Sequence, residues 1–346
     1  MASITTLKIN SYFFMGLLLL IFGLFVTVIG IILQLPIVVM AVIFALIIII
    51  YIAVSSSIVK LTTGTRYLKK DEIPWLEAKV QELTRKAEVP MPKLGIVDDP
   101  TPNAFVFGLT QSGSTLTVHR GLLEQLNDEE IEAVLGHEIG HIKNRDCMYM
   151  TFLAAIPLIA YVGMRLLFMV RYGGGKRDGR ALAIILAIGL ISAIVYFLTN
   201  LLIKRLSRIR EYFADAYSAH ITKNPHALAS ALTKITYGLS LAPPKDKAKN
   251  AARSFYIGDV QNAHTDMTRI LSNKSRYDLD GDGVIDENEL QLAMMDDANR
   301  SMWDRWGGIF RTHPPTFKRI LALKDLEKDL EKGEVRSDNI YEKVEF

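Results

Sequence analysis

Between Lys8 and Lys60 the sequence contains no charged side chain, and most residues of this stretch are apolar. About 20 consecutive apolar residues are enough for a helix to cross a lipid bilayer, so the stretch has room for two such helices. We expect one helix over residues 11–33 and a second over residues 36–59, joined by a tight turn at LQLP. A cleaved signal peptide explains the region poorly, because the first run is too long and no small-residue cleavage site follows it.

Two further apolar runs cover residues 148–170 and 181–203. Their length favours membrane helices over buried core helices, so we expect about four membrane helices in all. The positive-inside rule places the ends of the second and fourth runs on the cytoplasmic side, because basic residues follow them. These residues are Lys60, Arg66, Lys69, Lys70, Lys204, Arg205, Arg208 and Arg210. The loop over residues 171–180 disagrees with a full crossing of the second pair, because it would face outward yet carries four basic residues.

Composition narrows the classes of function. The chain has 346 residues, half of them hydrophobic, and a formal net charge of +3. It contains no Lys/Arg-rich tract with interleaved aromatic residues and no zinc-finger cysteine set, which argues against nucleic-acid binding. The single cysteine, Cys147, excludes an internal disulfide and a cysteine-based zinc ribbon, and we expect it to be inert.

The polar regions predict a small sheet beside helices, so the expected fold class is a mainly α membrane protein with a small α+β domain. Strands are expected at KLGIVDD (93–99), NAFVFG (103–108) and STLTVHR (114–120), the last with the alternation of a half-buried strand. Asn127 followed by Glu130 predicts a capping box at the start of a helix. Other helices are expected within residues 72–90, ending at Pro90, over residues 207–221 and 221–242, and from residue 316 onward.

The sequence HEIGH, residues 137–141, raises the question of a catalytic metal. His137 and His141 are four residues apart, so on a helix they share a face, as two ligands of one zinc ion require. Glu138 follows the first histidine and is placed to take a proton from water that zinc has acidified. A chance occurrence of this short pattern is the alternative. Gly136 and Gly140 weaken the helix, and close packing against another element would justify them.

A catalytic zinc site keeps three protein ligands, so a third ligand is needed. Glu211 in REYFADA is the candidate, although an ordinary salt bridge with Arg208 or Arg210 is an equally simple use for it. Asp215 lies one turn further on the same helix face and can orient an imidazole. Spacing alone leaves the two interpretations of Glu211 open.

Four segments together resemble the HtpX-type membrane metalloproteases, relatives of the CAAX prenyl endoproteases and of the mitochondrial protease OMA. They are NAFVFG, HEIGHIKNRD, REYFADAYSA and THPPTFKRI, in that order along the chain. The resemblance implies a gluzincin fold for the catalytic domain, with Zn²⁺ held by His137, His141 and Glu211. It also implies that Glu138 is the general base.

The same resemblance implies roles for residues around the metal. NAFVFG would be an edge strand on which an extended substrate peptide pairs, so that Asn103, Ala104 and Phe105 bind substrate. His313 would stabilise the oxyanion, with support from Arg319, although capping a turn is its simpler alternative. Asn144 and Asp146 would support the site rather than take part in the chemistry.

A second motif, DLDGDGVIDENE at residues 278–289, matches a calcium-binding EF-hand loop at each defined position. The expected Ca²⁺ ligands are Asp278, Asp280, Asp282, Val284, Asp286 and Glu289. An acidic surface loop is the alternative. This loop is not a feature of the resembled family and looks like an insertion. It either stabilises the inserted segment only, or lets calcium modulate activity.

These observations predict a membrane-embedded zinc endopeptidase that cleaves misfolded or specific membrane proteins at the cytoplasmic surface of a plasma or inner membrane, as in quality control under stress. The zinc should lie about 10–15 Å from the bilayer, because few residues separate His141 from the third run. The alternatives are a prenyl-peptide processing protease and a non-catalytic, calcium-responsive membrane adaptor. Protein substrates and the bilayer are the expected partners, with no nucleic acid, and the oligomeric state stays open.

The expected division of the chain has six parts. They are a membrane hairpin (1–59), the first catalytic part (60–147), a second membrane hairpin (148–203), the third-ligand region (204–245), a connector with the EF-hand-like insertion (246–300), and the HPP segment with a C-terminal amphipathic helix (301–346).

Overall fold

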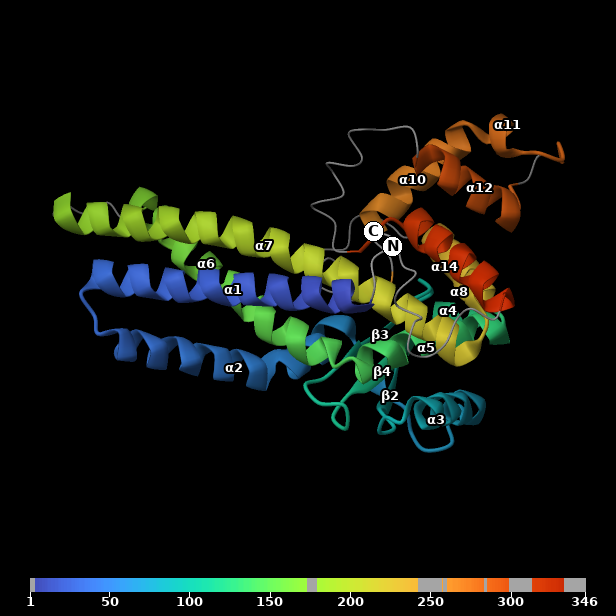
Figure 1. Cartoon of the computed structure of the whole chain (residues 1–346), viewed down its shortest axis with the longest axis horizontal. Coiled ribbons are helices and arrows are strands. Elements are labelled where there is room, and N and C mark those ends of the chain that lie inside the picture. The colour runs from blue at the N-terminus through green and yellow to red at the C-terminus, as the bar shows by residue number, and fades with distance from the viewer. Residues whose placement is uncertain are drawn as a thin grey trace.

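The computed structural model describes residues 4–172, 179–241, 257, 260–282, 285–298 and 313–332. Figure 1 shows four long helices that run side by side and project from one end of a part containing a small sheet. The long helices are α1 (Ile4–Leu33), α2 (Ile37–Thr63), α6 (Asp146–Tyr172) and α7 (Gly179–Thr222). All four are long and apolar enough to cross a membrane. The expected fold class is confirmed.

The turn between α1 and α2 closes where the sequence predicts it. Gln34 takes a positive φ of 54°, and the Leu35 N–H donates to the Gly30 carbonyl. The fourth helix, α7, does not end with its apolar run. It continues without a break to Thr222 and so carries Glu211 and Asp215 from the membrane segment into the other part of the molecule.

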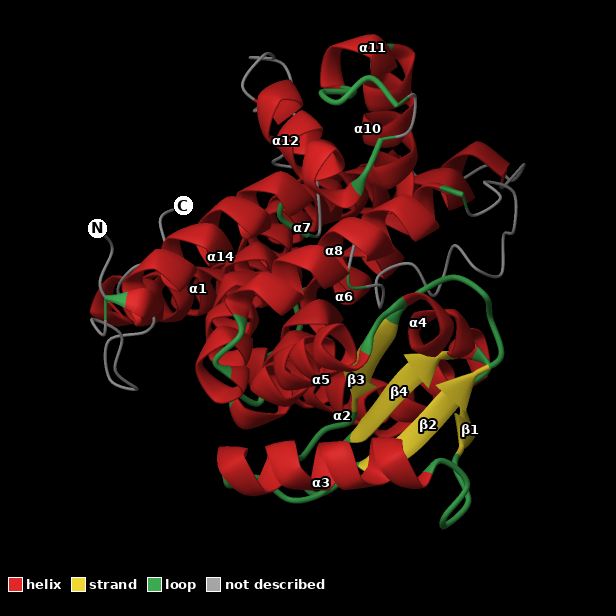
Figure 2. Cartoon of the chain, turned by 90° about the vertical axis from the view of Figure 1, so that its right-hand side faces the viewer, coloured by secondary structure: helices red, strands yellow, loops and turns green. Residues whose placement is uncertain are grey.

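The sheet has four strands in the order β1-β2-β4-β3. They are β1 (Arg66–Tyr67), β2 (Lys93–Val97), β3 (Ala104–Phe107) and β4 (Thr115–His119). The pair β2–β4 is parallel and the other two pairs are antiparallel. The three expected strands are present, β1 is additional, and β3 lies at an edge (Figure 2).

One expectation about the sheet is wrong: β4 is buried at all five positions rather than half-buried. Leu116 and Val118 belong to the main core. On the opposite face, the His119 ring bonds the Thr101 carbonyl through Nδ1 at 3.0 Å. The segment before β3 therefore covers the second face of this central strand, and the polar alternation of β4 does not mark a solvent-facing side.

The helix α5 (Asp128–Lys143) packs against α3 (Pro74–Ala87), α7 and α8 (Pro225–Ser240), and the other helices lie further out. They are α4 (Arg120–Gln125), α10 (Val260–Ser272), α11 (Lys274–Tyr277), α12 (Glu287–Ala298) and α14 (Thr316–Glu331). Leu76, Val80 and Leu83 of α3 are fully buried, as their spacing predicts. The main core joins these residues to apolar residues of α5, α7, α8, α10, α12 and α14, so α5 is held on most of its circumference.

Candidate metal centre and substrate cleft

The capping box expected at the start of α5 is present. Asn127 Oδ1 accepts from the Glu130 N–H at 2.9 Å, and Glu130 Oε2 accepts from the Asn127 N–H at 2.9 Å. The helix that starts there places His137 and His141 on one face, with their Nε2 atoms 3.2 Å apart. His137 is buried and His141 is partly buried, and two imidazoles that approach through their Nε2 atoms can bind one metal ion between them.

Glu211 of α7 completes a set of three. Its Oε2 lies 3.7 Å from His137 Nε2, and its Oε1 lies 3.7 Å from His141 Nε2. Two ligands about 2.0–2.1 Å from a tetrahedral zinc ion lie roughly 3.3 Å apart, close to these separations. Glu211 Oε2 also forms an ion pair with Arg319 Nη1 at 3.2 Å, and a carboxylate held beside a cation stays charged, as a metal ligand must be. The His-His-Glu set therefore fits zinc.

The two glycines of the motif let α5 and α7 approach closely. A Cβ atom added at Gly140 would lie 3.2 Å from the Ala214 Cα, and one added at Gly136 would lie 3.1 Å from the Ser218 Oγ. Such spacing is tighter than ordinary van der Waals contact, so larger residues would push the helices apart. The expectation of close packing is confirmed, and its partner is the helix that carries Glu211.

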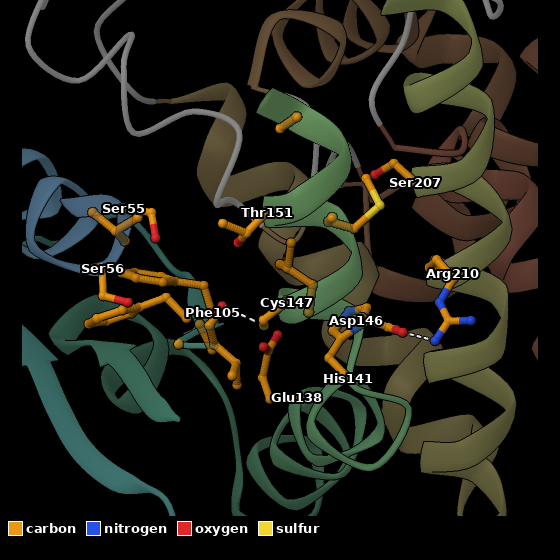
Figure 3. A pocket seen from close by; sticks show the side chains of 18 of the residues that line it. Ser55, Ser56, Phe105, Glu138, His141, Asp146, Cys147, Thr151, Ser207 and Arg210 are labelled. Atoms are coloured by element: carbon orange, nitrogen blue, oxygen red, sulfur yellow. Dashed lines mark hydrogen bonds and ion pairs between the residues drawn. The ribbon is translucent and has the colours of Figure 1, made fainter. Parts of the chain in front are cut away.

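A carboxylate lies behind each imidazole. Asp215 Oδ1 is 2.9 Å from His137 Nδ1, and Asp146 Oδ2 is 2.8 Å from His141 Nδ1. A hydrogen bond at Nδ1 fixes the tautomer that leaves Nε2 free to bind a metal. Arg210 forms an ion pair with Asp146, as Figure 3 shows, and also donates to the Asn144 carbonyl at 3.0 Å. Asn144 thus acts through its main chain, at the end of α5.

Arg319 of α14 is buried beside the other carboxylate. It donates two hydrogen bonds to Asp215 and a third, at 2.8 Å, to the Ile257 carbonyl. Burial alone would lower the pKa of Arg319, but the carboxylates of Asp215 and Glu211 outweigh this effect and raise it. The resemblance implies that Arg319 supports His313; in the structure Arg319 bonds Asp215 and the Ile257 carbonyl, lies 3.5 Å from His137 Nδ1, and forms an ion pair with Glu211 at 3.2 Å.

A cavity of about 460 Å³ opens beside the metal ligands (Figure 3). Glu138 lines this cavity and is only 3% exposed, and its burial raises its pKa. His313 also lines it, with Nδ1 3.5 Å from Glu211 Oε1. Neither ring nitrogen of His313 has a hydrogen bond within the described part of the chain. Both residues therefore line the cavity with polar side chains beside the metal ligands.

The edge strand β3 forms one wall of the cavity. The Asn103 carbonyl accepts from the His119 N–H, so in this antiparallel pair residues 103, 105 and 107 direct their main-chain groups toward β4. Ala104 and Val106 consequently direct theirs toward the free edge. Among the residues expected to bind substrate, Ala104 offers its main chain and Phe105 lines the cavity.

Asn103 has a different position from the one expected for a residue that touches substrate. It is fully buried, and its Oδ1 accepts from the Ile257 N–H at 2.9 Å. Because Arg319 bonds the carbonyl of the same residue, Ile257 is held from both sides. Ile257 also lines the cavity, so Asn103 shapes the cleft indirectly.

Sequence reasoning missed how close Cys147 lies to this cleft. Its Sγ donates to the Val106 carbonyl at 3.4 Å, on the free edge of β3, and it lines the cavity. It also missed α2 as a wall, because nothing in an apolar run shows which of its residues will face a cavity rather than lipid.

The acidic loop lies apart from the metal centre, between α11 and α12. Asp278, Asp280 and Asp282 bring one oxygen each within 4.8 Å of the others. Glu289 Oε1 accepts from the Leu279 N–H and its Oε2 from the Asp286 N–H, so this carboxylate ties together the two ends of the loop. Val284 lies outside the described residues.

The model of peptidase family M48 matches residues 70–327, which is well over half of the chain. The chain belongs to peptidase family M48. The resemblance to HtpX-type proteases is therefore confirmed, and the chain is a zinc metallopeptidase with the membrane helices described above.

Three relatives show the extent of the similarity. A "Protease HtpX homolog" of Methanothermobacter thermautotrophicus is 42% identical over 187 residues, covering 54% of this chain and 69% of the relative. One of Bacteroides fragilis is 32% identical over 279 residues, covering 78% and 74%. A "Protease HtpX homolog 2" of Methanosarcina mazei is 31% identical over 279 residues, covering 80% of each.

Among solved structures, the crystal structure of S. mikatae Ste24p gives a TM-score of 0.49 at 17% identity. That comparison covers 88% of this chain and 62% of the Ste24p chain, so this chain spans less than two thirds of that protein's length.

Proposed function

We propose that this M48 protein is an endopeptidase that cleaves membrane proteins, misfolded ones among them, next to the cytoplasmic face of the bilayer. The observation that carries the proposal is which helices supply the metal ligands. Glu211 lies on the same unbroken helix as an apolar membrane segment, and the helix α6 begins only five residues after His141. A metal bound there is held close to the membrane surface, where loops of membrane proteins are within reach.

The residues of the site divide the chemistry between them. His137, His141 and Glu211 would hold zinc, which lowers the pKa of water toward 7 and draws electron density from a peptide carbonyl. Glu138 accepts the proton of the attacking water and passes it to the leaving amine. His313 donates a hydrogen bond to the carbonyl oxygen as negative charge develops there. The free main-chain groups of Ala104 and Val106 align the substrate strand.

The orientation rests on charge. Basic residues follow α2 and the apolar part of α7, at the end of the helices that bears the metal ligands. Because such residues are retained on the cytoplasmic side, we assign the metal centre to that side. Cysteine accessibility in intact cells tests this assignment. In a Cys147→Ala background, Lys70→Cys should react only with thiol reagents that cross the membrane.

Activity is the primary test of the proposed function. The protein, purified in detergent with one zinc ion per chain, should cleave an unfolded test protein, and Glu138→Gln should abolish cleavage while zinc stays bound. Glu124→Gln, an exposed site on α4, is the matched control. If wild type and Glu138→Gln cleave equally, Glu138 is not the base. If neither cleaves while zinc is bound, the chain is not an endopeptidase of general specificity.

Proximity to the membrane has its own test. One substrate sequence is offered either fused to a transmembrane helix or as a soluble peptide, both in the same detergent or liposome preparation. The tethered form should be cleaved faster, and equal rates would contradict the membrane-protein proposal. Cleavage confined to a prenylated peptide would instead support the processing protease.

We also propose that the loop over residues 278–289 binds calcium. The convergence of Asp278, Asp280 and Asp282 supports the proposal, together with the bridging position of Glu289. Asp280→Asn should weaken calcium binding in a titration, whereas Glu287→Gln, at a position that is not a ligand, should not. If peptidase activity is the same with calcium and with a calcium-selective chelator, zinc being restored, calcium only stabilises the loop.

A further inference from the structure

The cavity beside the metal ligands has a wall made by a membrane helix. Tyr51, Ser55, Ser56, Ile58, Val59 and Thr62 of α2 line it, opposite the metal ligands of α5 and α7. Figure 3 shows Ser55 and Ser56 on one side of the cavity and Asp146 and Arg210 on the other. A helix whose length and composition suit membrane anchoring thus also shapes the space in which substrate must bind.

The pleat of β3 determines which substrate side chains meet this wall. Ala104 and Val106 point into the main core, whereas Phe105 and Phe107 pack on the opposite face with Val97 and Val59. A peptide that pairs with the free edge of β3 continues the sheet, so its residue opposite Phe105 puts its side chain on the same face as Phe105. That side chain lies between β3 and α2.

The chemistry of the wall selects the kind of side chain. None of the six lining residues of α2 carries a charge, and the acidic residues that line the cavity, Glu138, Asp146 and Glu211, belong to the metal end. A charged side chain placed against α2 would lose water without gaining a partner there, which is costly. Phe105, Val59 and Met150 offer apolar surface instead.

We propose that α2 is a specificity-determining wall of the substrate cleft, which receives a large apolar or aromatic side chain of the peptide beside the metal centre. The inference rests on the proposed endopeptidase function and deepens it by naming the substrate class. The cavity volume of about 460 Å³ is in the range of pockets that enclose a ligand group. Trp and Tyr are enriched at the ends of membrane helices, so a peptide segment from such an end would offer aromatic side chains.

Adjacent serines of α2 provide a matched pair of variants. Ser56 lines the cavity, whereas its neighbour Ser57 is exposed on another side of the helix. Ser56→Phe fills the space between α2 and β3, and Ser57→Phe adds the same ring to the outer surface. Ser56→Ala removes only a hydroxyl and should behave as wild type.

The test uses full-length protein in detergent and a set of quenched fluorescent peptides in which each position around the scissile bond carries Phe, Ala or Lys. Wild type should prefer Phe at one position. Ser56→Phe should lower kcat/KM for that peptide at least tenfold and leave the Ala peptide within about twofold, while Ser57→Phe retains the preference. An unchanged preference in Ser56→Phe, or equal loss in both variants, would overturn the proposal.

Binding separates this inference from the proposed function. In a Glu138→Gln background, Kd values are measured by fluorescence anisotropy. Ser56→Phe should raise the Kd for the Phe peptide tenfold and leave the Kd for the Ala peptide nearly unchanged. This result would support the role of α2 even if wild type cleaved no peptide. Absence of cleavage by wild type would overturn only the proposed function. An equal effect on all peptides would overturn the inference, because the wall would then not distinguish one side chain from another.

Discussion

Arg319 donates two hydrogen bonds to Asp215, from Nε to Oδ2 at 2.8 Å and from Nη2 to Oδ1 at 2.7 Å. Both side chains are almost fully buried, and Asp215 in turn contacts the ring of His137. The last described helix of the chain is therefore connected through one carboxylate to the first proposed zinc ligand. Two residues that are far apart in sequence hold one imidazole in its metal-binding orientation.

Arg319→Met should damage both stability and metal binding. Removing one partner of a buried ion pair leaves an uncompensated carboxylate and costs about 3–5 kcal/mol. Loss of the contacts that orient a ligand lowers metal affinity about 10–100-fold. Thermal unfolding in detergent and competition with a zinc chelator measure the two effects.

Lys318→Met is the matched control, because Lys318 is exposed on the same helix, α14. It should leave the unfolding temperature and zinc affinity unchanged. An Arg319→Met protein with normal zinc affinity would show that Asp215 orients His137 without help from Arg319.

Asp146→Asn should weaken zinc binding without unfolding the protein. The amide keeps the size of the side chain but loses the charge that faces His141 Nδ1 and Arg210. Zinc affinity should fall about 10–100-fold, measured by chelator competition. Asp128→Asn, in the exposed first turn of α5, is the control and should bind zinc as wild type does. Equal affinities of the two variants would show that His141 needs no carboxylate behind it.

Local rules in the sequence predict much of this centre. The spacing of His137 and His141 and the capping box at Asn127 are both local, so they can be read from a few residues. Gly136 and Gly140 also indicate a close contact with another element. What the sequence does not contain is the partner: Gly140 meets Ala214 only because α7 passes along α5. Glu211 therefore could be chosen only by resemblance, since its alternative with Arg210 has equally plausible spacing.

The contacts of buried charged residues were beyond sequence reasoning for the same reason. Arg210 pairs with Asp146 of α6, a residue distant from it in the chain. The full burial of β4 and the wall formed by α2 likewise depend on how distant segments pack. Periodicity gives the faces of an element, and tertiary packing decides what covers them.

Glu130 gives the protein a pH-dependent contribution to stability away from the metal centre. Burial by itself would raise the pKa of Glu130, but hydrogen bonds from Lys234, Ser230 and the Asn127 N–H outweigh it and hold the pKa below its ordinary value of 4.5. A folded-state pKa below the unfolded one stabilises the fold at pH above about 4.5, and this contribution is lost as the pH falls through the folded value.

Glu130→Gln should therefore unfold at a lower temperature than wild type at pH 7, by a loss of roughly 1–3 kcal/mol. The difference should shrink as the pH is lowered below about 4.5, where wild type also loses the charge. Thermal unfolding across a pH series measures both effects, with Glu124→Gln as the exposed control. A difference that stayed constant down to the lowest pH would mean that the carboxylate contributes through its shape and not its charge.

Cys147 should influence substrate binding rather than catalysis. Its thiol donates a weak hydrogen bond to the Val106 carbonyl, one of the groups that face the free edge of β3. A substrate strand that pairs there must compete for this carbonyl. A serine hydroxyl is a stronger donor than a thiol, so Cys147→Ser should raise KM several-fold, whereas Cys147→Ala frees the carbonyl and should keep or lower KM. With kcat and zinc content unchanged in both variants, this order would support pairing at Val106. A fall of kcat in both would show instead that the thiol itself takes part in the reaction.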